Sequence, residues 1–239
     1  MNEITIVIQG PISHYLYRKL HNYKKYGKIL ISTWDYVDVS FLPEYINIIS
    51  KPLPDKSKTI GTISNFYYAV CGMYNAMKKV ETKYFIRTRG DEYFENLEPL
   101  INKFKKNKNK IICGNIFAKK WNDRPLHIGD HLYIGKSKIF KEVFSHLRNM
   151  YEKKISLESW AIQGGLDMDP VLNIKRSSEA EVILAKAILQ LKSCPKELWY
   201  DKKLFLKYFD IFDINLTKPF IARWQNGKKK YKNNFKNPH

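Results

Sequence analysis

The stretch Lys83-Tyr84-Phe85-Ile86-Arg87-Thr88-Arg89-Gly90-Asp91-Glu92-Tyr93-Phe94 decides the fold that this sequence predicts. A short run of aromatic and β-branched residues that stops at a glycine is typical of a buried parallel strand. In open α/β sheets, ligands bind outside the carboxyl ends of the strands. The two carboxylates directly after Gly90 therefore lie where they could hold a divalent cation shared with a phosphate group.

A structural explanation of the acidic pair is also open, because acidic residues are favoured in the first turn of a helix that would follow. The two arginines of the strand favour a phosphate site instead, since guanidinium groups bind phosphate oxygens in pairs. Side chains alternate between the two faces of a strand. Arg87 and Arg89 should therefore share one face and line one cleft, whereas Thr88 should point to the other face.

The rest of the chain alternates between predicted strands and helices, which indicates a mostly parallel central sheet with right-handed crossovers. Strands are expected at residues 4–8, 28–33, 46–49, 84–88, 111–117 and 131–135, and helices at residues 15–26, 63–79, 138–150 and 178–191. This pattern predicts the α/β class, with one domain over residues 1–225 and a basic, flexible tail over residues 226–239.

Charge and composition restrict the function classes. The chain has 239 residues and 42 Lys plus Arg against 23 Asp plus Glu, a formal net charge of +19. This excess predicts attraction to anionic partners such as phosphorylated metabolites or a charged membrane surface, to which the protein could bind peripherally. No zinc-finger, RNP-like or helix-turn-helix pattern indicates a specific nucleic-acid partner. The chain contains no apolar run of about 18 residues that could span a membrane.

The cysteines indicate the compartment. Cys71, Cys113 and Cys194 are widely spaced and form neither a metal motif nor a disulfide framework, so a reducing, cytoplasmic location is expected. The composition also suits a viral or AT-rich bacterial source, in which case the location would be the host or bacterial cytoplasm.

Two further motifs carry candidate chemistry. The turn Gln9-Gly10-Pro11 after the first strand presents backbone amides at the sheet edge, although it matches neither a dinucleotide fingerprint nor a P-loop. The segment His127-Ile128-Gly129-Asp130-His131 lacks the spacing of a zinc helix. On an extended segment the two histidines would share a face and Asp130 would oppose them. We expect a substrate-binding role, because such titratable residues are rarely buried without purpose.

A helix start supplies another candidate. Ser178 and Glu181 have the spacing of a capping box, so Glu181 is most simply explained as the capping partner. Glu179 then remains as a carboxylate at the helix start that could serve as a general base.

Together, four motifs resemble the WavE-like lipopolysaccharide-synthesis glycosyltransferases in order and spacing, from residue 3 to about residue 190. They are residues 4–11, 32–34, 87–92 and 127–135. The resemblance implies a single GT-A-like, Rossmann-like domain and a nucleotide-diphosphate-sugar donor, such as a UDP-sugar. It further implies a glycan acceptor and usually Mn²⁺ or Mg²⁺.

The resemblance also implies roles for matching positions. Asp91 would be the main metal-contacting acid of a degenerate acidic motif, and Glu92 and His131 would be further metal ligands. The catalytic residues would be Asp91, Asp130 and Glu179. His127 and Asp130 would contact the acceptor. The nucleotide sugar would be bound by Gln9, Gly10, Pro11, Thr33, Trp34, Asp35, Asn65, Arg87 and Arg89.

Two departures from the family pattern affect these roles. Ser178-Glu179-Ala180 replaces a Pro-Glu-Gln pattern, and Gly90 replaces a serine or acid, which leaves one ligand fewer before Asp91. The expected reaction is sugar transfer to a glycan hydroxyl, with the metal and the arginines neutralising the departing diphosphate. The alternatives are a non-catalytic module that binds polyanions or carbohydrate, and then a nucleotidyltransferase.

Overall fold

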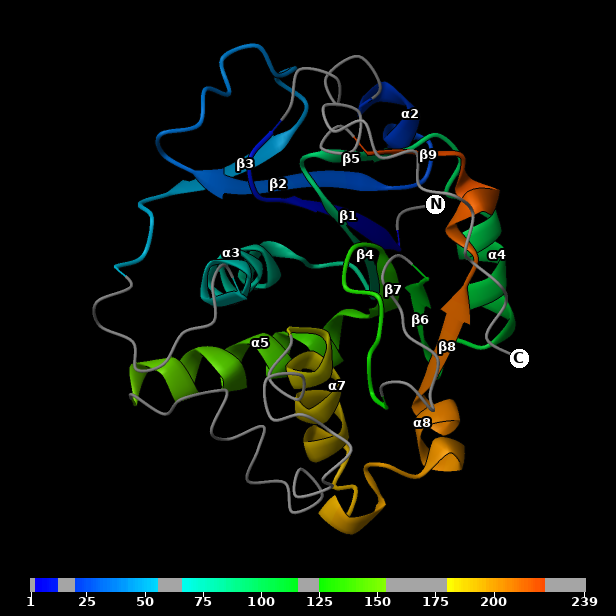
Figure 1. Ribbon diagram of the computed structural model, residues 1–239. Coiled ribbons are helices and arrows are strands. Elements are labelled where there is room, and N and C mark those ends of the chain that lie inside the picture. Colours follow the sequence, from blue (N-terminus) through cyan, green and yellow to red (C-terminus); the bar gives the residue numbers. More distant parts are fainter. Residues whose placement is uncertain (1–2, 13–19, 56–65, 116–124, 154–179, 222–239) are drawn as a thin grey trace, which may run out of the picture.

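A computed structural model describes residues 3–12, 20–55, 66–115, 125–153 and 180–221 of the chain. Its centre is a seven-stranded sheet of order β3-β2-β1-β4-β7-β6-β8 (Figure 1). The strands are β1 (Ile4–Gln9), β2 (Lys28–Trp34), β3 (Asn47–Lys51), β4 (Tyr84–Arg89), β6 (Ile111–Gly114), β7 (Tyr133–Lys136) and β8 (Phe209–Phe212). The first four are mutually parallel and reproduce part of the strand order of Rossmann-like sheets.

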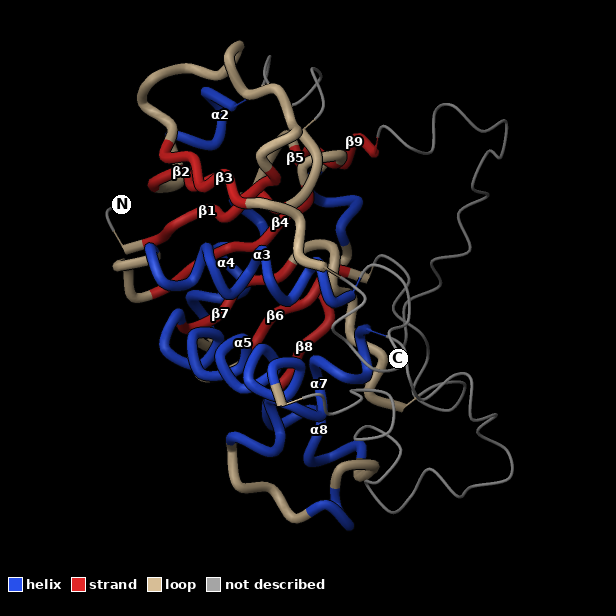
Figure 2. Tube along the Cα trace, turned by 90° about the vertical axis from the view of Figure 1, so that its left-hand side faces the viewer, coloured by secondary structure: helices blue, strands red, loops and turns tan. Residues whose placement is uncertain are grey.

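Helices cover both faces of this sheet. One face packs against α2 (Leu20–Lys24) and α4 (Glu98–Lys106), and the other against α3 (Phe66–Lys79), α5 (Ser137–Glu152) and α7 (Ala180–Leu191). Figures 1 and 2 show α2 on one side of the strands and α3, α5 and α7 on the other. The α/β class and the mostly parallel sheet flanked by helices are therefore confirmed.

Strand β4 shows how the sequence pattern produces these two cores. Tyr84 and Ile86 are buried in the core on the α2 and α4 side, whereas Phe85 is buried in the core on the α3 and α5 side. Arg87 and Arg89 continue the row that begins at Phe85. Because β4 continues as a strand to Arg89, this alternation puts both arginines on one face, which changes from apolar to charged as the strand reaches the sheet edge.

Three features differ from the sequence-based expectations. Strand β7 runs antiparallel to both of its neighbours, β4 and β6. No helix begins at the acidic pair, because Glu92 starts the short strand β5 (Glu92–Phe94), which pairs with β9 (Pro219–Ile221). The strand expected at residues 111–117 ends at Gly114 among the described residues, and Asn115 follows it as a loop residue.

The sequence analysis assigned no elements beyond residue 191, where the structure has several. These are a short 3-10 helix (Lys196–Leu198), α8 (Lys202–Tyr208), β8, a second 3-10 helix (Ile214–Thr217) and β9. Strand β8 completes the sheet by pairing in parallel with β6. The predicted tail at 226–239 lies outside the described residues, as do residues 15–19 of the helix predicted at 15–26; its described part contains α2. Within the described part of the chain, no helix is both long and apolar enough to span a bilayer.

Candidate functional site

The candidate site lies where the strand order reverses. Successive strands β1, β2 and β3 progress in one direction from β1, whereas β4 lies on the other side of β1. In open α/β sheets, this switch point leaves a crevice at the carboxyl ends of the strands in which ligands bind. The turns after β1 and β4 meet here, since the Gly90 amide donates a hydrogen bond to the Gln9 carbonyl at 2.9 Å.

Two glycines allow these turns to approach each other. Gly10 has a φ of 97°, a backbone conformation that residues with a side chain rarely adopt. A Cβ atom on Gly90 would lie 2.2 Å from the carbonyl oxygen of Pro11. The predicted nucleotide-binding turn and the acidic motif are therefore in direct backbone contact.

Gln9 fixes the first arginine. Its side-chain oxygen accepts hydrogen bonds from Arg87 Nε at 3.3 Å and Nη2 at 3.0 Å, and its amide nitrogen donates to the Ala69 carbonyl on α3. Arg87 is 5% exposed, and its guanidinium lies 5.7 Å from the Tyr133 ring centre. Within the described part of the chain, its Nη1 has no hydrogen-bond partner, and a carboxylate oxygen of Asp130 lies 3.8 Å away. Gln9 and Arg87 are thus held as one buried unit.

Arg89 is the more accessible of the two arginines, with 30% of its side chain exposed. It donates from Nε and Nη2 to the two carboxylate oxygens of Asp91 at 2.8 and 2.9 Å. The neighbouring acids Asp91 and Glu92 raise the pKa of the Arg89 guanidinium against the opposing effect of burial. A guanidinium has five N–H donors, so this fork with Asp91 leaves donors for a further anion. Asp91 thereby orients Arg89.

The other acid of the pair turns inward. Glu92 is 1% exposed, and its Oε1 makes a close hydrogen-bond contact with Nδ1 of His131, which is 4% exposed. His131 Nε2 lies 3.6 Å from Asp130 Oδ1, and Arg89 Nε lies 3.5 Å from Glu92 Oε1. His131 therefore joins the segment before β7 to the acidic motif after β4.

The expected alternation of the histidine motif is wrong. The segment before β7 is not a strand, and Leu126 has a positive φ of 62°. Asp130 does not oppose the histidines: it lies beside His131, and His127 contributes to its electrostatic environment. His127 Nε2 is 3.9 Å from Oε2 of Glu181 on α7.

The charges around Asp130 determine its protonation. Burial disfavours the charged carboxylate, but Arg87, His131, Arg89 and His127 outweigh this effect and lower the pKa of Asp130 below its ordinary value. At neutral pH, Asp130 is therefore an ionised carboxylate and a weak base. Efficient general bases have pKa values near the operating pH. This environment favours Asp130 as a group that binds and orients over its predicted role as proton acceptor.

The lowered pKa of Asp130 predicts a pH-dependent contribution to stability. A carboxyl whose folded-state pKa is depressed stabilises the fold above its unfolded-state pKa of about 3.9 and loses that contribution as the pH falls through the folded-state value. We expect wild type to be more stable than Asp130→Asn at pH 7, and the difference to shrink at pH 3. Urea unfolding of both proteins at the two pH values measures this difference, and an equal difference at both pH values would contradict the assignment.

The residues predicted to contact the base or ribose lie at the end of β2. Thr33 is buried, and its hydroxyl has no hydrogen-bond partner among the residues that the structure describes. Trp34 is buried in the core and makes an edge contact with Tyr68 at 6.0 Å. Asp35 is exposed, and its amide donates to the Lys51 carbonyl. Asp35 is thus the member of this trio that solvent reaches, and the contacts of all three with a nucleotide stay predictions.

The described residues do not fit a metal ion of the predicted kind. Among them, no three His, Cys, Asp or Glu side chains converge in a group that could hold one. Both oxygens of Asp91 accept from Arg89, and Glu92 faces His131. The prediction that Asp91, Glu92 and His131 bind Mn²⁺ or Mg²⁺ thus gains no support from their arrangement. The positively charged groups that the described part of the site offers to an anion are the two arginines.

Two predicted site residues, Asn65 and Glu179, lie outside the described residues. The structure brings together most of the others, namely Gln9, Gly10, Pro11, Arg87, Arg89, Asp91, Glu92, Asp130 and His131. The sequence analysis missed the proximity of Glu181 to His127, because the capping-box spacing already explained Glu181. The contact between Arg87 and the Tyr133 ring was also not predicted. The alternation of side chains along β7 could have indicated that Tyr133 faces Arg87.

Comparisons with known proteins give limited information. No protein-family model matches the chain, and no curated protein matches it. Among solved structures, HddC from Yersinia pseudotuberculosis is 16% identical, with a TM-score of 0.37, covering 59% of this chain and 79% of that one. The same protein complexed with GMP-PN gives 15% identity and the same score, covering 59% and 80%.

A third solved structure extends over more of the chain. It is a putative glucose-1-phosphate thymidylyltransferase from Bacillus anthracis in complex with a sucrose, at 14% identity and a TM-score of 0.41, covering 70% of this chain and 85% of that one. Similarities of this size do not assign a function.

Proposed function

We propose that this protein transfers a sugar from a nucleotide-diphosphate-sugar donor to a hydroxyl group of a glycan. The observation that carries the proposal is the pair of arginines at the switch point of the sheet, with donors left for an anionic ligand. Phosphate groups of nucleotides bind at such edges of Rossmann-like sheets. The resemblance of the motifs to WavE-like enzymes favours glycosyl transfer within this class.

The charges of the site suit a departing diphosphate. Arg89 is accessible and oriented by Asp91, so its remaining N–H groups can contact phosphate oxygens. Arg87 is buried behind it and adds positive charge in a region of low dielectric constant. Fixed donors at the position where charge develops stabilise the transition state strongly.

In the proposed step, the bond between the anomeric carbon and the diphosphate oxygen breaks, and its electron pair leaves with the nucleoside diphosphate. A bond from the acceptor hydroxyl oxygen to the anomeric carbon forms. A carboxylate accepts the hydroxyl proton if the anomeric centre inverts. Because its lowered pKa makes Asp130 a weak base, we assign it to orienting the acceptor. Glu179 stays the predicted general base.

A thermal-shift screen with UDP, GDP, ADP, CDP and dTDP, each with and without Mn²⁺, tests the donor class. A ligand raises the unfolding temperature because it binds only the folded state. We expect one nucleotide to raise it, and the shift to vanish in Arg89→Ala. If Asp91 orients Arg89, Asp91→Ala should weaken the shift equally with and without metal; a shift that needs Mn²⁺ would restore the predicted metal site.

The product distinguishes the two enzyme classes. A glycosyltransferase releases a nucleoside diphosphate, whereas a nucleotidyltransferase forming a nucleotide sugar releases pyrophosphate. Release of pyrophosphate from a nucleoside triphosphate and a sugar phosphate would therefore contradict the proposal. No shift with any nucleotide, together with polyanion binding that weakens steeply with salt, would favour the binding-module alternative.

A further inference from the structure

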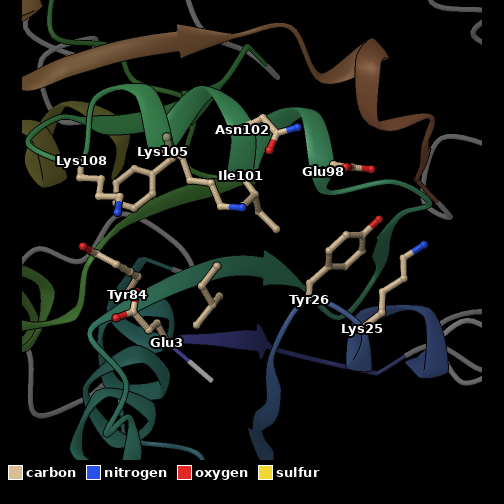
Figure 3. Close-up of a pocket in the computed structure, with 11 residues that line it drawn as sticks. Glu3, Lys25, Tyr26, Tyr84, Glu98, Ile101, Asn102, Lys105 and Lys108 are labelled. Atoms are coloured by element: carbon tan, nitrogen blue, oxygen red, sulfur yellow. The ribbon is translucent and has the colours of Figure 1, made fainter. Parts of the chain in front are cut away.

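A pocket lies at the opposite end of the sheet from the candidate site (Figure 3). It is lined by Glu3 and Ile4 at the start of β1, Tyr84 at the start of β4, the residues directly after α2, and one face of α4. Its volume of about 510 Å³ is within the range of small-molecule sites. Strand β1 has six residues, so about 20 Å of sheet separates this pocket from the carboxyl ends of the strands.

The inner wall of the pocket is apolar and preorganised. Tyr84 is 5% exposed and makes an edge contact with Phe104 at 5.1 Å. Ile4 and Ile101 complete this wall. Across the pocket, the Tyr26 hydroxyl donates to the Asn96 side chain at 2.9 Å, which fixes the ring. Such walls can hold the apolar face of a ring without first having to become ordered.

The periodicity of α4 places polar groups around this wall. One face of α4 carries Glu98 and the residues three, four and seven positions after it, which are Ile101, Asn102 and Lys105. In Figure 3, Ile101 and Lys105 extend from α4 toward the strands, and Asn102 and Glu98 lie along the helix. Lys105 is exposed, and no carboxylate among the described residues forms an ion pair with it. Its ammonium group is therefore available to an anionic ligand at the pocket.

The rim contains further groups of both signs. Lys25 and Lys108 lie at the pocket with Lys105, and each is held over an aromatic ring: Lys25 over Tyr26 at 4.9 Å and Lys108 over Tyr84 at 5.8 Å. The carboxylates of Glu3 and Glu98 are only acceptors, so they require ligand donors, whereas the lysines require ligand acceptors. A matching ligand carries hydroxyl groups and an anionic group on a compact ring.

We propose that this pocket binds a sugar ring that bears a phosphate or carboxylate group. The lysines bind the anion, the acids and Asn102 bind hydroxyl groups, and the aromatic wall contacts the face of the ring. This inference goes beyond the proposed donor site and does not depend on it, because the two regions share no residue.

Isothermal titration with glucose 1-phosphate and with glucuronate tests the pocket, with glucose and inorganic phosphate as partial ligands. We expect an anionic sugar to bind more tightly than either partial ligand. Lys105→Glu should weaken binding at least about tenfold, because it replaces a charge-assisted hydrogen bond by repulsion. Lys106→Glu is the matched control: Lys106 is exposed on the same helix, does not line the pocket, and should leave the affinity within about twofold.

Arg89→Ala separates this pocket from the candidate donor site, since it should leave anionic-sugar binding unchanged. Loss of binding in Arg89→Ala would place the ligand in the donor site and overturn the proposal. If Lys105→Glu and Lys106→Glu weakened ligand binding equally, the effect would come from the overall charge of the protein and not from this pocket. That result would also overturn the proposal. So would the absence of binding by both anionic sugars, or binding of glucose or phosphate alone with the same affinity.

Discussion

Replacing Arg89 by alanine is expected to lower the rate of sugar transfer by about 10²- to 10³-fold, the effect of removing one preorganised donor from a developing anion. Arg89 is the accessible cation at the switch point, and Asp91 holds it with two hydrogen bonds. The measurement is the release of nucleoside diphosphate from the nucleotide sugar identified by the binding screen. Arg89→Lys should recover little of the rate, because an ammonium group cannot reproduce the planar fork.

Two further variants make this prediction specific. Arg148 on α5 forms an ion pair with Glu152 in the next helical turn, outside the candidate site, so Arg148→Ala should keep the transfer rate near that of wild type. Asp91→Asn keeps one acceptor for Arg89 and should reduce the rate less than Asp91→Ala, for which we expect a loss on the order of 10²-fold. If Arg89→Ala transferred sugar at the wild-type rate, the proposed role of the arginines in the reaction would be contradicted.

Replacing His131 by alanine is expected to destabilise the fold by about 3 kcal/mol, because it removes the closest recognised contact of the buried Glu92 carboxylate and leaves it with the longer contact to Arg89. Glu92 and His131 are almost fully buried and in close contact, and they connect two segments that are far apart in the sequence. Urea unfolding followed by circular dichroism measures the free energy of unfolding. The double variant His131→Ala with Glu92→Gln should recover part of the loss, since it also removes the buried charge.

The matched control for His131 is His21. This histidine is exposed on α2, where a substitution should change stability by no more than about 0.5 kcal/mol. If His131→Ala were as mild as His21→Ala, the contact with Glu92 would not contribute to folding. The pH dependence of Asp130→Asn then becomes the sharper probe of this cluster.

The sequence was sufficient for those parts of the fold that depend on local pattern. Strands β1, β2 and β4 each contain a short, mostly apolar and buried run that is followed by polar or turn residues, and the alternation of side chains puts Arg87 and Arg89 on one face. The direction of β7 could not be predicted in this way. A strand carries the same side-chain alternation in either direction, and its orientation is set by pairing with β4 and β6.

Contacts between distant residues limited the prediction of the site. The acidic pair was predicted to act together, yet its two members separate: Asp91 turns to Arg89 and Glu92 turns to His131. This division depends on which side chains the segment before β7 brings alongside, and spacing within the motif does not encode it. The same reason explains β5, whose partner β9 lies more than a hundred residues later in the chain.

The contact between Gly90 and Pro11 has a consequence for how this site could be altered. A side chain at position 90 has no room in this arrangement, because its Cβ would lie 2.2 Å from the Pro11 carbonyl oxygen. Restoring a fuller acidic motif by Gly90→Asp would therefore push the two strand-end turns apart before it supplied a ligand. A third acidic side chain at this strand end would therefore require the turn after β1 to be rebuilt first.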